Sequence, residues 1–203
     1  VYVGGGGGIY SINSAPNIEH CNILGNRGGG IYLYQSNATF VSSIIAFNQS
    51  RNGGGVYAYN SSPSFQRCRI DDNVGDGLWV TGDVKEIEGF ISDATELVRV
   101  SVRRDCATIA PTLQNTVISN NTGYGVFCNY TVAHFENCSI INNKHGGLHI
   151  RRAYLKPVSG SSFYHCSRFP SIRNSIINKD RPIEALLNTY NQVYDAESYL
   201  IWV

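Results

Sequence analysis

Acidic and basic side chains gather in two parts of the sequence where they could do chemistry. The acidic set is Asp71, Asp72, Asp76 and Asp93, and the basic set is Arg99, Arg103, His149 and Arg151. Clustered carboxylates can act as general acids and bases or bind Ca²⁺ through their oxygens. Asp71 and Asp93 take equivalent positions in the repeat described below, so they form a weak candidate calcium site. No base is paired with these acids and the histidines follow no metal-ligand spacing, so we predict no catalytic residues and no cofactor.

The six cysteines divide into two groups. Cys21, Cys68 and Cys138 share one inward repeat position, and Cys128 also points inward. Cys21 and Cys68 would lie two coils apart, which is about 9–10 Å and too far for a disulfide. We therefore expect buried free thiols at these positions. Cys106 and Cys166 fall in two inserted segments and form a candidate disulfide on the outside.

Asparagines in N-x-S/T triplets are candidate glycosylation sites. They occur at Asn37, Asn48, Asn60, Asn120, Asn129 and Asn137. We expect glycans at all of these except Asn48, whose side chain is needed in an asparagine ladder. The triplets and the cysteines together favour an extracellular or cell-surface location. The alternative is an Asn- and Ser-rich β protein in which the triplets arise by chance.

The composition limits the range of partners. The 203 residues carry a net charge of +1, with 15% charged and 42% hydrophobic residues, which suffices for one domain with a substantial core. This charge favours neither nucleic acid nor an anionic membrane as a partner. No apolar run reaches the length of about 18 residues that a membrane span requires.

The elements that position these residues come from an internal repeat. A hydrophobic residue follows each glycine cluster, at Ile9, Ile31, Val56, Leu78, Val126 and Leu148. The spacing is 22 to 25 residues except between Leu78 and Val126, where we interpret 48 residues as two turns with Val98 as the missing start. Apolar residues alternate with period 2, and the unit is too short for a βαβ crossover. Each unit therefore predicts one coil of three short strands, and each coil stacks on the preceding coil.

Successive coils repeat the same residue types at fixed distances from this start. Nine residues after each start lies a residue that we expect to point inward and that is aliphatic or aromatic, once insertions are allowed in the fifth and seventh units. These residues are Ile18, Phe40, Phe65, Ile87, Leu113, Phe135 and Ile172. Seventeen residues after the start, most units have an asparagine, which predicts a ladder of hydrogen-bonded side chains at a turn. These residues are Asn26, Asn48, Asn73, Asn121 and Asn143. The glycines are interpreted as corners that supply positive-φ turns and close coil-to-coil approach.

The outward residues of the first strand form an aromatic face. Its candidate binding or assembly residues are Tyr10, Tyr32, Tyr34, Tyr57, Tyr59, Trp79 and Phe127, with Arg99 and His149 in the same row. Three readings stay open: cross-strand stacking, assembly with another chain, and stacking on a polysaccharide.

The motif "IAFNQSRNGGGVY" and its recurrences "ILGNRGGGIY", "IDDNVGDGLW" and "INNKHGGLHI" resemble the repeats of right-handed parallel β-helices. The sequence resembles the pectin-lyase-like superfamily and, more narrowly, β-helices of the polymorphic outer-membrane-protein type. The resemblance implies an all-β, right-handed parallel β-helix of about seven coils over residues 1–180, with insertions near 103–111 and 151–170. Residues 181–203 form a C-terminal extension, either a capping helix and strand or the start of a new element.

From these features we expect a structural or adhesive segment of a larger secreted surface or fibre glycoprotein. Its expected partners are other protein chains or copies of itself, and glycans. The alternatives are a polysaccharide lyase or hydrolase of the superfamily, and a non-catalytic carbohydrate-binding β-helix, since this superfamily holds many functions on one fold.

Overall fold

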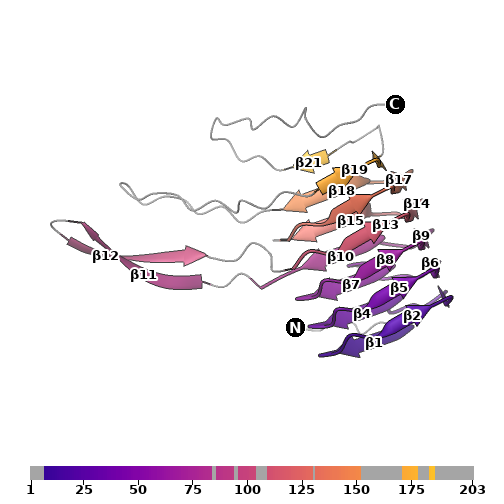
Figure 1. Cartoon of the computed structure of the whole chain (residues 1–203), viewed down its shortest axis with the longest axis horizontal. Coiled ribbons are helices and arrows are strands. Elements are labelled where there is room, and N and C mark those ends of the chain that lie inside the picture. Colours follow the sequence, from indigo (N-terminus) through magenta and orange to yellow (C-terminus); the bar gives the residue numbers. More distant parts are fainter. Residues whose placement is uncertain are drawn as a thin grey trace.

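The protein is a parallel β-helix, in which the chain winds through three short strands per coil and stacks each coil on the last (Figure 1). The computed structural model describes residues 7–83, 86–93, 96–103, 109–129, 131–151, 171–177 and 183–185. Within these ranges the regular elements are all strands, and no helix is long and apolar enough to cross a membrane. The all-β fold class predicted from the repeat is therefore confirmed.

The strands form three parallel sheets, here called sheets A, B and C. Sheet A consists of β1 (Ile9–Ile12), β4 (Ile31–Tyr34), β7 (Val56–Tyr59), β10 (Leu78–Thr81), β15 (Tyr124–Asn129), β18 (Gly146–Arg151) and β21 (Ile183–Ala185). Sheet B consists of β2 (Asn17–Glu19), β5 (Thr39–Val41), β8 (Ser64–Gln66), β13 (Thr112–Gln114), β16 (His134–Glu136) and β19 (Ser171–Arg173). Sheet C consists of β3 (Asn22–Leu24), β6 (Ile44–Ala46), β9 (Arg69–Asp71), β14 (Val117–Ser119), β17 (Ser139–Ile141) and β20 (Ile176–Ile177). Six coils contribute a strand to every sheet, and β21 begins the next coil.

The interval between Leu78 and Val126 is one coil with an insertion, not two coils. Strand β10 pairs directly with β15, with Leu78 opposite Val126, and β13 and β14 complete the coil that β10 begins. The prediction that Val98 starts a coil is therefore wrong, as is the placing of Ile87 at an inward position. Both residues belong to an antiparallel hairpin of β11 (Glu86–Asp93) and β12 (Glu96–Arg103), which extends away from the stacked coils in Figure 1.

The core is a set of side-chain ladders, because equivalent residues of successive coils stack in register. Phe40 and Phe65 are fully buried, and their ring centroids lie 4.9 Å apart in a stacked arrangement. Leu113 and Phe135 continue the same ladder across the insertion, with Phe65 opposite Leu113. Aliphatic residues of sheets A and C fill the rest of the interior, as the repeat predicted.

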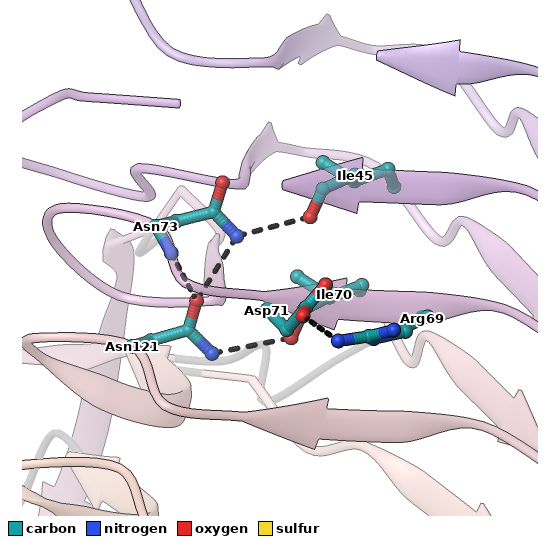
Figure 2. Close-up of polar contacts among 6 residues, drawn as sticks. All are labelled: Ile45, Arg69, Ile70, Asp71, Asn73 and Asn121. Carbon is teal, nitrogen blue, oxygen red and sulfur yellow. Dashed lines mark hydrogen bonds and ion pairs between the residues drawn. The ribbon is translucent and has the colours of Figure 1, made fainter. Parts of the chain in front are cut away.

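The asparagine ladder runs without a break through the insertion. Asn121 Oδ1 accepts hydrogen bonds from the backbone N–H of Asn73 at 3.1 Å and from Asn73 Nδ2 at 3.0 Å, and Asn121 Nδ2 donates to Ile70 O at 3.2 Å (Figure 2). Asn143 repeats this arrangement on Asn121 and Ile118. Because buried polar backbone groups are costly to leave unpaired, this ladder is what allows the corner between sheets C and A to be buried.

The glycine runs have two roles that fall on different residues. Gly29, Gly53 and Gly75 have positive φ values, from +60° to +114°, and turn the chain. Gly125 does not, but a Cβ there would lie 2.7 Å from both Asn143 Nδ2 and Gly147 O, so no side chain fits. Other corners are turned by non-glycine residues in the left-handed region, such as Ser42 and Arg67 between sheets B and C.

Two predicted features lie partly outside the described residues. The second insertion joins β18 to β19, and residues 152–170 within it are outside the described ranges. At the C-terminal end, Ile183–Ala185 is strand β21, which pairs in parallel with β18. Residues 186–203 lie outside the described ranges.

Candidate functional site

The outer face of sheet A carries one continuous row of stacked rings. Strand register places Tyr32 beside Tyr10 and Tyr57, and Trp79 beside Tyr57 and Phe127. Ring centroids along the row are 5.0, 5.3, 6.3, 4.4 and 4.8 Å apart, in the order Tyr10, Tyr32, Tyr57, Trp79, Phe127, His149. The row therefore exists as predicted, except that Arg99 belongs to the hairpin and not to this sheet.

The exposure of this row differs from the prediction. Tyr10 is 56% exposed, but Tyr32 is only 4% exposed and His149 7%. Each ring covers its neighbours because parallel stacking puts rings about one strand spacing apart. Burial raises the pKa of Tyr32 to about 12, with smaller contributions from the neighbouring tyrosines. Cross-strand stacking is thus present, and Tyr57, Trp79 and Phe127 remain partly exposed.

A second, shorter stack joins Tyr34 and Tyr59, whose ring centroids are 5.3 Å apart. The Tyr59 hydroxyl donates a hydrogen bond to the Asp83 carboxylate, and this bond, followed by burial, raises the pKa of Tyr59 to about 12. Asp83 also accepts from Asn60 Nδ2 at 2.6 Å, while its backbone N–H donates to Asn60 Oδ1 at 2.7 Å. These contacts fix the end of β10 where the chain leaves for the hairpin.

A pocket of about 270 Å³ opens beside the aromatic row at the corner between sheets C and A. Trp79, Tyr124 and Phe127 supply aromatic surface, and Asp76, Arg51, Thr122 and His145 supply polar groups, together with Gly75 and Gly123. The Tyr124 and Phe127 centroids are 5.8 Å apart, and His145 packs edge-on against Tyr124 at 5.7 Å. Residues from four successive coils thus meet at one surface.

The pocket lies where the glycine run is interrupted. One repeat position lies two residues before the hydrophobic start of each coil. It is occupied by Gly29 and Gly54 in two coils and by Asp76 and Tyr124 in the next two. The following coil has glycine again, and this Gly146 pairs with Tyr124. His145 stands where the preceding coil has Gly123. These departures from glycine are the sequence signal for the pocket. Our sequence reading noted Asp76 only as part of an acidic cluster, and it missed Tyr124, His145 and Arg51.

Asp76 is held at the pocket by its neighbours. It is 6% exposed, and its Oδ1 accepts a hydrogen bond from the backbone N–H of Tyr124 at 2.6 Å. A side chain at Gly123 would collide with this same oxygen, so glycine is required there for the carboxyl to fit. Burial raises the pKa of Asp76 from 3.8 to about 6, although the Tyr124 N–H and the charge of His145 act in the opposite direction.

This raised pKa predicts a pH-dependent stability. The folded protein binds more protons than the unfolded chain between pH 3.8 and 6, so the free energy of unfolding contributed by Asp76 falls as the pH rises through that window. Asp76→Asn removes the titration, while Arg51, His145 and Tyr124, the other charged or titratable groups lining the pocket, stay in place. We expect the variant to gain about 2 kcal/mol relative to wild type between pH 4 and pH 7 in urea unfolding. A difference that stays constant or reverses would contradict this assignment.

The candidate calcium pair is not brought together. Asp93 lies in the hairpin, and the strand neighbours of Asp71 are Ala46 and Ser119, so the register that made Asp93 its equivalent is wrong. Asp71 is 1% exposed and forms an ion pair with Arg69 (Figure 2). Burial raises the pKa of Asp71, and Arg69 opposes that change. Among the described residues, no group of three or more His, Cys, Asp or Glu side chains could hold a metal.

The basic set is also divided, since Arg99 and Arg103 lie in β12 whereas His149 belongs to the aromatic row of sheet A. The acids and bases that the sequence grouped as candidates therefore do not form one cluster in the parts of the chain that the structure describes.

The cysteines follow the inward pattern with one exception. Cys68, Cys128 and Cys138 are buried free thiols, whereas Cys21 is free but exposed, in contrast to our prediction. Burial raises the pKa of Cys128 to about 12 and also raises those of Cys68 and Cys138, so these thiols are poor nucleophiles. Cys106 and Cys166 lie outside the described residues, so their disulfide stays a prediction.

The glycosylation triplets differ in accessibility. Asn37, Asn120 and Asn137 are exposed, whereas Asn60 and Asn129 are half-buried with side-chain amides that donate to Asp83 and Thr81. Asn48 is fully buried, and its Nδ2 donates to Ile23 O at 2.9 Å and Asn73 Oδ1 at 3.1 Å. Asn48 therefore lies in the asparagine ladder that the sequence predicted, and its side-chain amide is already used there.

Comparison with known proteins supports the same fold. Residues 2–91 match the family model described as the right handed beta helix region. Neither the curated proteins nor the solved structures gave a match. The matched region covers the first coils, and strand pairing carries the same three-sheet pattern on to β21. The family match and the three stacked parallel sheets together identify the architecture of this chain as a right-handed parallel β-helix.

Proposed function

We propose that this chain is a structural and adhesive segment of a larger secreted surface or fibre glycoprotein, which assembles with other chains or copies of itself through the outer face of sheet A. The observation that carries the proposal is the row of six rings along that face, in which each ring packs against the next, three pairs stacked and two tilted. This packing restricts the ring positions, so little side-chain entropy remains to be lost on contact. Aromatic residues are enriched in the cores of protein interfaces.

The rigid backbone beneath the row also suits a structural role. The asparagine ladder runs through five successive coils, from Asn26 to Asn143, and the core ladders run beside it, so each of these coils is stabilised by contacts with its neighbours. The exposed triplets at Asn37, Asn120 and Asn137 support the extracellular part of the proposal. A lyase or hydrolase would require carboxylates and a base close together, and the strand pairing separates Asp93 from Asp71 and so divides the acidic set that the sequence grouped.

Introducing a charge on the face tests assembly. Tyr57 lies mid-row and does not line the pocket, so Tyr57→Lys places a charge in the proposed interface without altering the pocket lining. Sedimentation equilibrium at about 10–100 μM, the range of weak protein association, is expected to show dimers or larger species for wild type and monomers for Tyr57→Lys. Gln66→Lys introduces the same charge on the half-buried outer side of sheet B and should leave association unchanged. A monomeric wild-type chain would refute assembly through this face.

A further inference from the structure

The pocket beside the aromatic row combines two kinds of surface. Its lining includes the rings of Trp79, Phe127 and Tyr124 as well as the Asp76 carboxyl, the Arg51 guanidinium and the His145 imidazole. Asp76 Oδ1 is occupied by the Tyr124 N–H, whereas its Oδ2 makes no hydrogen bond within the described residues. Asp76 lines the pocket, so its second carboxylate oxygen can accept a hydrogen bond from a ligand there.

The charges around the pocket decide the class of ligand. An anion would meet the Asp76 carboxylate, and an organic cation would meet Arg51 and His145 at the same surface. A neutral ligand that carries both hydroxyl groups and an apolar face satisfies the acceptor, the two donors and the rings together. A pyranose ring has these properties, because its C–H face packs on aromatic rings while its hydroxyls hydrogen-bond outward. The volume of about 270 Å³ is at the small end of ligand sites, which suits one sugar residue.

We propose that this pocket binds a neutral pyranose residue of a glycan, with the sugar ring against Trp79 and Phe127, one hydroxyl donating to Asp76 Oδ2, and others accepting from Arg51 and His145. No bond is made or broken, so the site is one of recognition. The inference deepens the adhesive part of the proposed function by naming the partner chemistry. It does not depend on assembly between copies, so a monomeric chain that binds sugar would refute the assembly and leave this site standing.

Saturation-transfer NMR and calorimetry with the 203-residue chain test the site directly. The probes are methyl β-D-glucopyranoside, methyl β-D-galactopyranoside and methyl α-D-mannopyranoside. At least one should bind with a dissociation constant on the order of 1 mM, a typical affinity for a small ligand with few contacts. D-galacturonate and tetramethylammonium serve as anionic and cationic comparisons and should bind more weakly.

Variants connect the binding to this pocket. Trp79→Ala should weaken the best probe about tenfold or more through lost stacking, and Arg51→Ala about fivefold through one lost hydrogen bond. Arg51 is exposed, so its variant keeps the test valid if Trp79→Ala fails to fold. Tyr34→Ala removes an aromatic ring from the same sheet outside the pocket and should leave the affinity unchanged.

The proposal is overturned if the folded wild-type chain binds none of the three glycosides at 20-fold the expected dissociation constant, roughly 20 mM. Tighter binding of galacturonate or tetramethylammonium would overturn the assignment of a neutral sugar. Binding that Tyr34→Ala weakens as much as Arg51→Ala would place the site elsewhere on sheet A.

Discussion

Replacing Asn121 with alanine is expected to lower the free energy of unfolding by about 3–5 kcal/mol. Asn121 is 1% exposed and lies mid-ladder, with Asn73 on one side and Asn143 on the other. Truncation leaves the Asn73 N–H and the Ile70 carbonyl buried without their partner, and it creates a cavity too small to replace all the lost hydrogen bonds with water. Such unsatisfied groups cost more than an average hydrogen bond contributes.

Urea unfolding monitored by circular dichroism measures this effect. Asn22→Ala makes the same chemical change at an exposed residue of β3 and should alter stability by no more than about 0.5 kcal/mol. If Asn121→Ala were as mild as this control, the ladder would contribute little to stability, and the close approach of coils at that corner would need another cause. A partial loss of cooperativity, in which the coils on either side of residue 121 unfold separately, would instead agree with a solenoid stabilised by nearest-neighbour contacts.

The second large effect is expected at Phe65, which is fully buried and stacks on Phe40 at 4.9 Å. Phe65→Ala should reduce the free energy of unfolding by about 3–5 kcal/mol, from lost transfer energy and the cavity that remains. Leu113 on the other side of the ring cannot fill this cavity, because its position is fixed by strand pairing with β8 and β16.

Phe47→Ala is the matched control, because Phe47 is 62% exposed and undergoes the same truncation. It is expected to change stability by less than about 0.5 kcal/mol in the same assay. Equal effects at Phe65 and Phe47 would show that the ring ladder inside the helix is not the principal core.

The aromatic row shows how far sequence reasoning reaches at the functional face. Its members followed from the repeat, since a residue one position after each inward start must point outward. Their exposure did not follow, because it depends on side-chain orientation. Tyr32 is covered by Tyr10 and Tyr57 on either side. The pocket was also out of reach, since it joins Asp76, Tyr124 and His145, which stand 48 and 21 residues apart in the sequence.

The sequence by itself determined the coil, its three-strand period, the inward ladders and the row of asparagines, because stacking coils in register requires the same residue types at the same position. Only the tertiary structure decided that the 48 residues from Leu78 to Val126 form one coil with an inserted hairpin and not two coils. The hairpin residues Val98, Val100 and Val102 alternate like those of a coil strand, and period 2 does not distinguish antiparallel from parallel pairing. That distinction depends on which backbone each strand meets, and it moved Asp93 and Arg99 away from the candidate sites while bringing Asp76 and Tyr124 together.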